Sequence, residues 1–251
     1  MGVTVLALAA MGAGSAAAQG SPPQYEHTRG ISEFAFGAEV TAERAHFHRD
    51  GAGCPAPTEA CRRGGYVVRG DLVVVSDAGG NAPFVKASYI ANADVPATTG
   101  WLRRADLRIT DTAPDVPVSS WVGRFGATPF KRGNQALSAE LQIRLAPSGS
   151  LVLVGESVPT IEGRPFTQAP SAQADGPLTI TSRGGIQATY SGSPRGSCDL
   201  SRVLIGPYLA VDASGHECGG EGGLRATFQG LYLRAGARPS SSGGAPPARQ
   251  R

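Results

Sequence analysis

The chain has 251 residues, of which 35 are glycine and 19 are proline, and only 17% are charged. This composition favours many short strands joined by turns over long helices. The net charge is only +3, from 23 basic and 20 acidic side chains, which argues against a dedicated nucleic-acid surface.

The N-terminal stretch is typical of a secretory signal. Residues 3–11 are apolar but too few to span a bilayer, and the alanines at 16–18 are the small residues that a signal peptidase needs. We therefore expect residues 1–18 to be a cleaved signal peptide and the mature protein to be periplasmic or secreted. No later segment is apolar enough to cross a membrane, so we expect no membrane span.

Export makes disulfide bonds the expected state of the four cysteines. Cys54 lies close to Cys61 and Cys198 close to Cys218, so pairing within each local pair is the simplest of the three connectivities. The second bridge would stabilise the fold by roughly 3 kcal/mol through chain entropy. A zinc site is disfavoured, because neither pair has the short ligand spacing of a zinc finger.

Short strands are expected after a loose lead-in at residues 19–41. The segment RAHFHRD alternates, with Ala45 and Phe47 on one face and Arg44, His46 and His48 on the other. Next come two apolar runs in GYVVRGDLVVVSD, separated by a turn, and the block closes with PFVKASYIA and TTGWLRRADLRI. This block predicts a small domain over residues 42–110.

The order of these motifs resembles the bacterial SH3-like domain, SH3b, over residues 42–109. That family has an apolar strand leading into "GD" and valines, an aromatic followed by "xVxY", and "GWV" or "GWL" before the last strand. The matching positions here are Gly70, Asp71, Phe84, Ala87, Tyr89, Gly100, Trp101, Leu102 and Leu107. The resemblance implies a small barrel that binds the cell wall or a peptide.

A contact surface on this domain would use aromatic and anion-pairing side chains. The candidate residues are Phe84, Tyr89, Trp101, Arg103 and Arg104. Gly100 is expected to let the chain turn sharply, so that Trp101 can cover the end of a small core. Core packing is the main role expected of Trp101, beside a role in direct ligand contact.

A second unit is expected after a linker at residues 111–120, which holds two prolines and no periodic pattern. In residues 121–235 the segments SAELQIRLA and SLVLVGESV predict a hairpin, and five further strands are expected up to GLRATFQGLYLRA. The ending is loosely similar to periplasmic lysozyme-inhibitor and lipocalin-like folds, in which Trp121 would plug a barrel or pack in its core. Residues 236–251, rich in proline, serine, glycine and arginine, are expected to be disordered.

The titratable residues do not assemble into a predicted catalytic or metal site. His46 and His48 share a strand face and suit a metal dyad, but the sequence offers no obvious third ligand. His216 and Glu217 beside Cys218 indicate a tight stapled loop, and no serine lies in a nucleophile elbow. We predict no enzyme, no metal and no cofactor.

These observations predict an all-β protein, in which an SH3-like barrel precedes a second small antiparallel barrel or sandwich and disulfides staple the fold. The expected function is that of an exported, non-enzymatic binding protein of the cell envelope. Its SH3b-like domain would bind peptidoglycan or an exported protein partner. The alternative is a periplasmic inhibitor of a hydrolase such as lysozyme, acting through the C-terminal domain.

Overall fold

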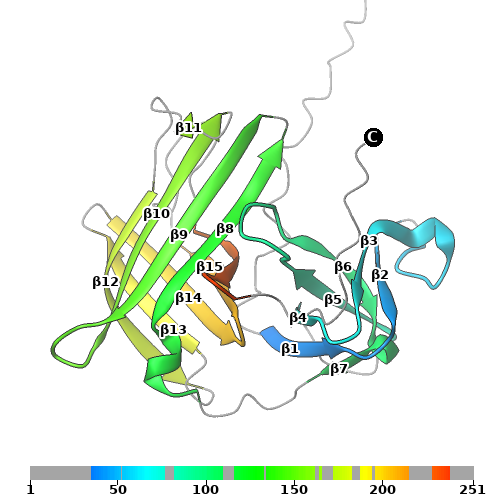
Figure 1. The fold of residues 1–251 in the computed structure, drawn as a ribbon, viewed down its shortest axis with the longest axis horizontal. Helices are drawn as coiled ribbons and strands as arrows, with labels where there is room; N and C mark the ends of the chain where they lie inside the picture. The colour runs from blue at the N-terminus through cyan, green and yellow to red at the C-terminus, as the bar shows by residue number, and fades with distance from the viewer. Residues whose placement is uncertain are drawn as a thin grey trace, which may run out of the picture.

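The computed structural model describes residues 35–51, 53–76, 82–109, 116–132, 134–161, 164–165, 172–182, 187–193, 196–214 and 228–237. Within these residues the protein is all-β, as predicted, and consists of two antiparallel sheets with three short 3-10 turns (Figure 1). The expected signal peptide and most of the expected C-terminal tail lie outside the described residues.

The first sheet has seven strands among the described residues, in the order β3-β2-β6-β5-β4-β1-β7. One face of the sheet carries a core of small and β-branched side chains with Phe47 and Leu102. The alternation predicted for β2 is confirmed, since Ala45 and Phe47 point into this core. The bounds are β1 (Ala35–Val40), β2 (Arg44–His48), β3 (Arg62–Val68), β4 (Leu72–Ser76), β5 (Phe84–Tyr89), β6 (Thr98–Arg103) and β7 (Leu107–Ile109).

Strand β1 corrects the end of the loose lead-in expected at residues 19–41, while residues 19–34 lie outside the described residues. Ala35–Val40 lies inside the sheet, paired with β4 on one side and with β7 on the other. Two of its inward side chains, Ala38 and Val40, are fully buried. The segment AFGAEV contains a glycine, a glutamate and two alanines, residue types that are depleted in strands, and here pairing on both edges determines the structure.

The first cysteine pair forms the predicted disulfide. Cys54 and Cys61 are bonded, with 5.6 Å between their Cα atoms, and they close the loop between β2 and β3 that contains η2 (Glu59–Cys61). The second pairing stays a prediction, because Cys218 lies outside the described residues.

The second sheet is an up-and-down meander that closes on itself. Its order is β11-β10-β12-β13-β14-β15-β16-β8-β9, and β9 also pairs with β10. Apart from the short β11, the described strands therefore form a ring of eight, the architecture of a small antiparallel barrel. The bounds are β8 (Gly123–Arg132), β9 (Gln135–Leu145), β10 (Leu151–Ile161), β11 (Arg164–Pro165), β12 (Ala172–Ser182), β13 (Gln187–Ser193), β14 (Gly196–Ile205), β15 (Tyr208–Ser214) and β16 (Gly230–Arg234).

The turn η4 (Val118–Trp121) leads into the first strand of this ring. Trp121 is fully buried in the core of the second sheet, together with Phe125 and Tyr232. Arg234, at the end of the last strand, stacks its guanidinium 4.6 Å from the centre of the Phe125 ring. The same guanidinium donates to the carbonyl oxygens of Ser120 and Val122. Arg234 thus joins the last strand to the turn that opens the first.

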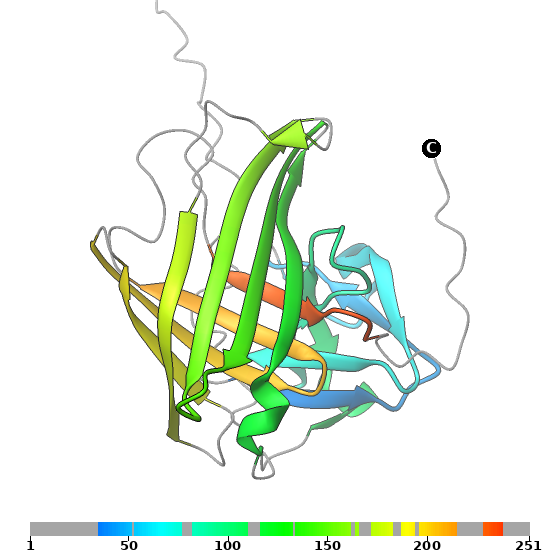
Figure 2. The ribbon, with the colours of Figure 1, turned by 60° about the vertical axis from the view of Figure 1, so that its left-hand side comes forward.

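A third hydrophobic cluster joins the two sheets. Val74 and Ile90 from the first sheet region pack with Ile205 and Leu233 from the second. The Tyr208 hydroxyl donates across this junction to the carbonyl oxygen of Ile90 at 3.4 Å. The two sheets therefore share buried apolar surface, and Figure 2 shows β1 and β4 lying close to β14 and β15.

Candidate functional site

The structure brings part of the predicted contact set together. Phe84 lies opposite Arg103, and Lys86 lies opposite Trp101, in the pairing of β5 with β6. Directly opposite residues point to the same side of a sheet. Val85, Ala87 and Leu102 point into the core of the first sheet, so Phe84, Trp101 and Arg103 lie together on the other, outward face.

Tyr89 and Arg104 lie elsewhere. Tyr89 packs against the core on the inward side, and its hydroxyl interacts with the buried carboxylate of Asp71. Burial and this neighbouring carboxylate raise the pKa of Tyr89 to about 12. Arg104 belongs to η3 (Arg104–Asp106), where its backbone N–H donates to Pro83 at 2.9 Å. Tyr89 therefore faces away from Trp101, and the role of all five residues in binding stays a prediction.

The outward side of β3, β2, β6 and β5 carries arginines beside aromatic rings. The Arg44 guanidinium lies 4.7 Å from the centre of the Tyr66 ring, and Arg62 lies opposite His48 in the pairing of β3 with β2. The Trp101 indole N–H donates to Asp50. We call this surface the aromatic–cationic face, formed by Arg44, Arg62, Tyr66, Phe84, Lys86, Trp101 and Arg103.

His48 lies on the same side of β2 but is buried. Its ring meets Phe84 edge-on at 5.0 Å between ring centres, and burial lowers the pKa of His48. His46 is partly exposed and contacts the Tyr66 ring at 5.6 Å. Among the described residues no group of three metal-ligating side chains occurs. The two histidines thus take part in packing on this face.

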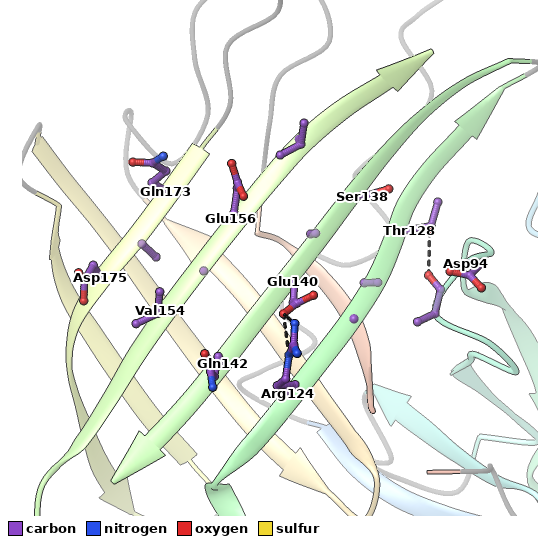
Figure 3. A pocket seen from close by; sticks show the side chains of 17 residues that line it. Asp94, Arg124, Thr128, Ser138, Glu140, Gln142, Val154, Glu156, Gln173 and Asp175 are labelled. Atoms are coloured by element: carbon purple, nitrogen blue, oxygen red, sulfur yellow. Dashed lines mark hydrogen bonds and ion pairs between the residues drawn. The ribbon is translucent and has the colours of Figure 1, made fainter. Parts of the chain in front are cut away.

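The second candidate site is a groove of about 810 Å³ on the outside of β8, β9, β10 and β12 (Figure 3). The loop between β5 and β6 forms one wall, because Thr128 donates to the Ala93 carbonyl oxygen at 2.7 Å. Gly126 permits this approach, since a Cβ there would lie 3.1 Å from the Cβ of Ala93. The groove therefore combines strands of the second sheet with a loop of the first.

Acidic and amide side chains dominate this groove. Within the described part of the chain, its charged residues are four carboxylates and one cation: Asp94, Glu140, Glu156, Asp175 and Arg124. Glu140 and Glu156 are directly opposite each other in the pairing of β9 with β10. Arg124 pairs with Glu140 at 2.6 Å, while Gln142 and Gln173 add hydrogen-bonding groups. We call this surface the acidic groove.

The acidic groove was not foreseen from the sequence. The outward positions of Glu140 and Gln142 could be read from the alternation in SAELQIRLA. Their alignment with Glu156 and Gln173 depends on strand register, and the placement of Asp94 depends on packing between the two sheets.

No protein-family model, curated protein or solved structure matches the chain. Within the described ranges, no helix is long and apolar enough to cross a membrane. Most loops of the second sheet, through which an inhibitor would act, lie outside those ranges. The inhibitor alternative therefore stays a prediction.

Proposed function

We propose that the protein is an exported, non-enzymatic binding protein of the cell envelope. Its aromatic–cationic face binds peptidoglycan or an exported protein partner. The SH3b resemblance covers the same strands and gives the same expectation of wall or peptide binding. The signal-like N-terminal sequence and the Cys54–Cys61 disulfide support an oxidising compartment.

The aromatic–cationic face is the observation that carries this proposal. Trp101 is partly exposed between Lys86 and His48, and the exposed Arg103 lies on the next outward position of β6. Aromatic and arginine side chains dominate the energetics of binding surfaces. Arginine pairs strongly with carboxylates, which the stem peptides of peptidoglycan carry. A positively charged face with one tryptophan suits such an extended anionic ligand.

The test is co-sedimentation of residues 19–251 with purified peptidoglycan sacculi. The double variant Arg44→Ala/Arg103→Ala should bind about tenfold more weakly, because each exposed cation contributes up to about 1 kcal/mol. The matched control, Arg144→Ala/Lys131→Ala, removes the same charge from exposed positions in the second sheet and should pellet like the wild type.

Equal binding by both double variants would contradict the assignment of this face. Wild-type protein that stays in the supernatant would exclude peptidoglycan and direct the search to an exported protein partner. Tyr89 is unsuitable as a test position, because its side chain packs inside the fold beside Asp71. Its replacement would report on stability as well as on binding.

A further inference from the structure

We propose that the protein self-associates head to tail, with the aromatic–cationic face of one copy docking in the acidic groove of the next. The occupant of the groove is thus a second copy of this chain. The inference does not depend on peptidoglycan binding, since it needs only the two surfaces that the structure places on one molecule.

The two surfaces have opposite charge. The aromatic–cationic face carries four cations, Arg44, Arg62, Lys86 and Arg103, with Asp50 and Glu59 as the described carboxylates that contact it. The acidic groove has four carboxylates and one cation. Among the described residues the face therefore has an excess of about two positive charges and the groove an excess of about three negative charges, and such complementarity steers association and fixes its register.

The acidic groove also holds like charges close together in the free protein. Glu156 lies directly opposite Glu140, and like charges at opposite positions of adjacent strands are destabilising. Arg124 approaches Glu140, and no ion pair of Glu156 occurs among the described residues. Asp94, on the other wall, is exposed. A docked arginine would relieve this repulsion.

The shapes of the two surfaces also allow one to dock on the other. The aromatic–cationic face is the outward side of a sheet, on which Trp101 is partly exposed, and the groove is an open hollow of about 810 Å³. Its amide side chains, Gln142 and Gln173, can bind to a polar rim. An aromatic anchor surrounded by charged and polar contacts is the usual anatomy of an interface.

Among the described residues, no ion pair joins the aromatic–cationic face to the acidic groove of the same molecule. Arg62 pairs with Glu59 in the first sheet region, and Arg124 pairs with Glu140 in the second. The hydrophobic cluster at the junction joins the sheets elsewhere, through Val74, Ile90 and Leu233. A contact between two different surfaces is heterologous, so it generates a ring if the rotation closes and a filament if it does not.

The first measurement is sedimentation velocity of wild-type residues 19–251 over a concentration series. At about 0.02 M salt the weight-average mass should rise with concentration, and at about 0.5 M salt it should return to that of the monomer, because salt screens exposed charges. Wild-type protein that stays monomeric at low salt overturns the proposal.

Two charge-reversal variants then test the surfaces. Arg44→Glu/Arg103→Glu reverses the face but leaves the groove intact, and Asp94→Lys/Glu156→Lys reverses the groove but leaves the face intact. Each variant alone should be monomeric at low salt. An equimolar mixture should associate again at low salt, because the intact face of the groove variant complements the intact groove of the face variant and the two reversed surfaces also complement each other. A mixture that stays monomeric overturns the proposal, even if both variants fail to associate alone.

The matched control is Arg69→Glu/Lys131→Glu, which makes the same charge change outside both surfaces and should associate like the wild type. Association that persists in both reversal variants would show that a different surface is responsible and would also overturn the proposal. Circular dichroism confirms that each variant is folded. The groove variant keeps the aromatic–cationic face, so its pelleting with sacculi reports on wall binding separately from self-association.

Discussion

Asp71 takes part both in the turn between β3 and β4 and in the buried packing of the first sheet. Its carboxylate accepts the Val68 N–H at 2.8 Å within the turn between β3 and β4, where Gly70 has a φ of 86°. This backbone hydrogen bond could be predicted from the Gly-Asp sequence, because aspartate in turns commonly bonds nearby N–H groups. The burial of Asp71, only 3% exposed, could not, because it depends on packing by Tyr89 and the second sheet.

The pH dependence of stability follows from this burial. Burial raises the pKa of Asp71 above its ordinary value of 3.8, so the folded state holds its proton to higher pH than the unfolded state does. The protonated carboxyl of Asp71 therefore stabilises the folded state at low pH. This stabilisation is lost as the pH rises from about 4 through the pKa of Asp71 in the folded state, and above that pKa no further loss occurs. Asp71→Asn keeps an acceptor for Val68 without ionising. We therefore expect the variant to gain stability relative to the wild type over that window.

Urea denaturation of both proteins from about pH 3 to about pH 8 measures this difference. A difference in unfolding free energy that is independent of pH would show that Asp71 does not titrate as expected. A wild type that gains on the variant as pH rises would show that the pKa of Asp71 is shifted downward instead.

At the scale of the element, β6 explains why a glycine precedes Trp101. The sequence suggested a sharp turn at Gly100, but Gly100 lies within strand β6 and pairs with Ala87. A Cβ at this position would lie 2.9 Å from the His48 carbonyl oxygen and 3.3 Å from the Phe47 ring. Glycine is therefore needed for the close approach of β2 to β6.

Gly100→Ala should destabilise the protein by about 1–3 kcal/mol, because the added methyl group overpacks a rigid contact with backbone. Gly64→Ala is the matched control in β3, where no atom lies within 4 Å of an added Cβ. That variant should be neutral or slightly more stable than the wild type. Urea midpoints measure both changes, and equal effects of the two substitutions would contradict the close-approach argument.

Strands with clear alternation could be predicted, and strands without it could not. The segments for β2, β9 and β10 were found from their inward apolar residues. Strand β8 was missed because GRFGATPFKR contains two glycines and a proline, and residues of that kind are depleted in strands. Its position is set by pairing with both β9 and β16 at the closure of the ring.

For the whole molecule, the contact between the two sheets was not predicted from the sequence. Val203, Ile205 and Tyr208 face away from the core of the second sheet and are buried at the junction with the first. The largely apolar run around them, RVLIGPYLAV, indicates burial on both faces, because the sequence of a strand that is buried on both faces does not alternate between apolar and polar residues. Which surface covers the second face required the structure. The acidic groove, with Asp94 on one wall, depends on the same junction.

This junction predicts that the two sheets unfold together. Val74, Ile90, Leu231 and Leu233 would be exposed to water if either sheet unfolded alone, and burying such side chains contributes about 1.5–3 kcal/mol each.

Trp101 reports on the first sheet and Trp121 on the second, and the chain has no other tryptophan. Protein labelled with fluorotryptophan should therefore show two fluorine resonances, assigned with Trp101→Phe, that lose their native signals at the same urea concentration. Two separate midpoints would mean that the sheets are independent domains. In that case Leu231→Ala would shift only the Trp121 signal, whereas cooperative unfolding requires it to shift both.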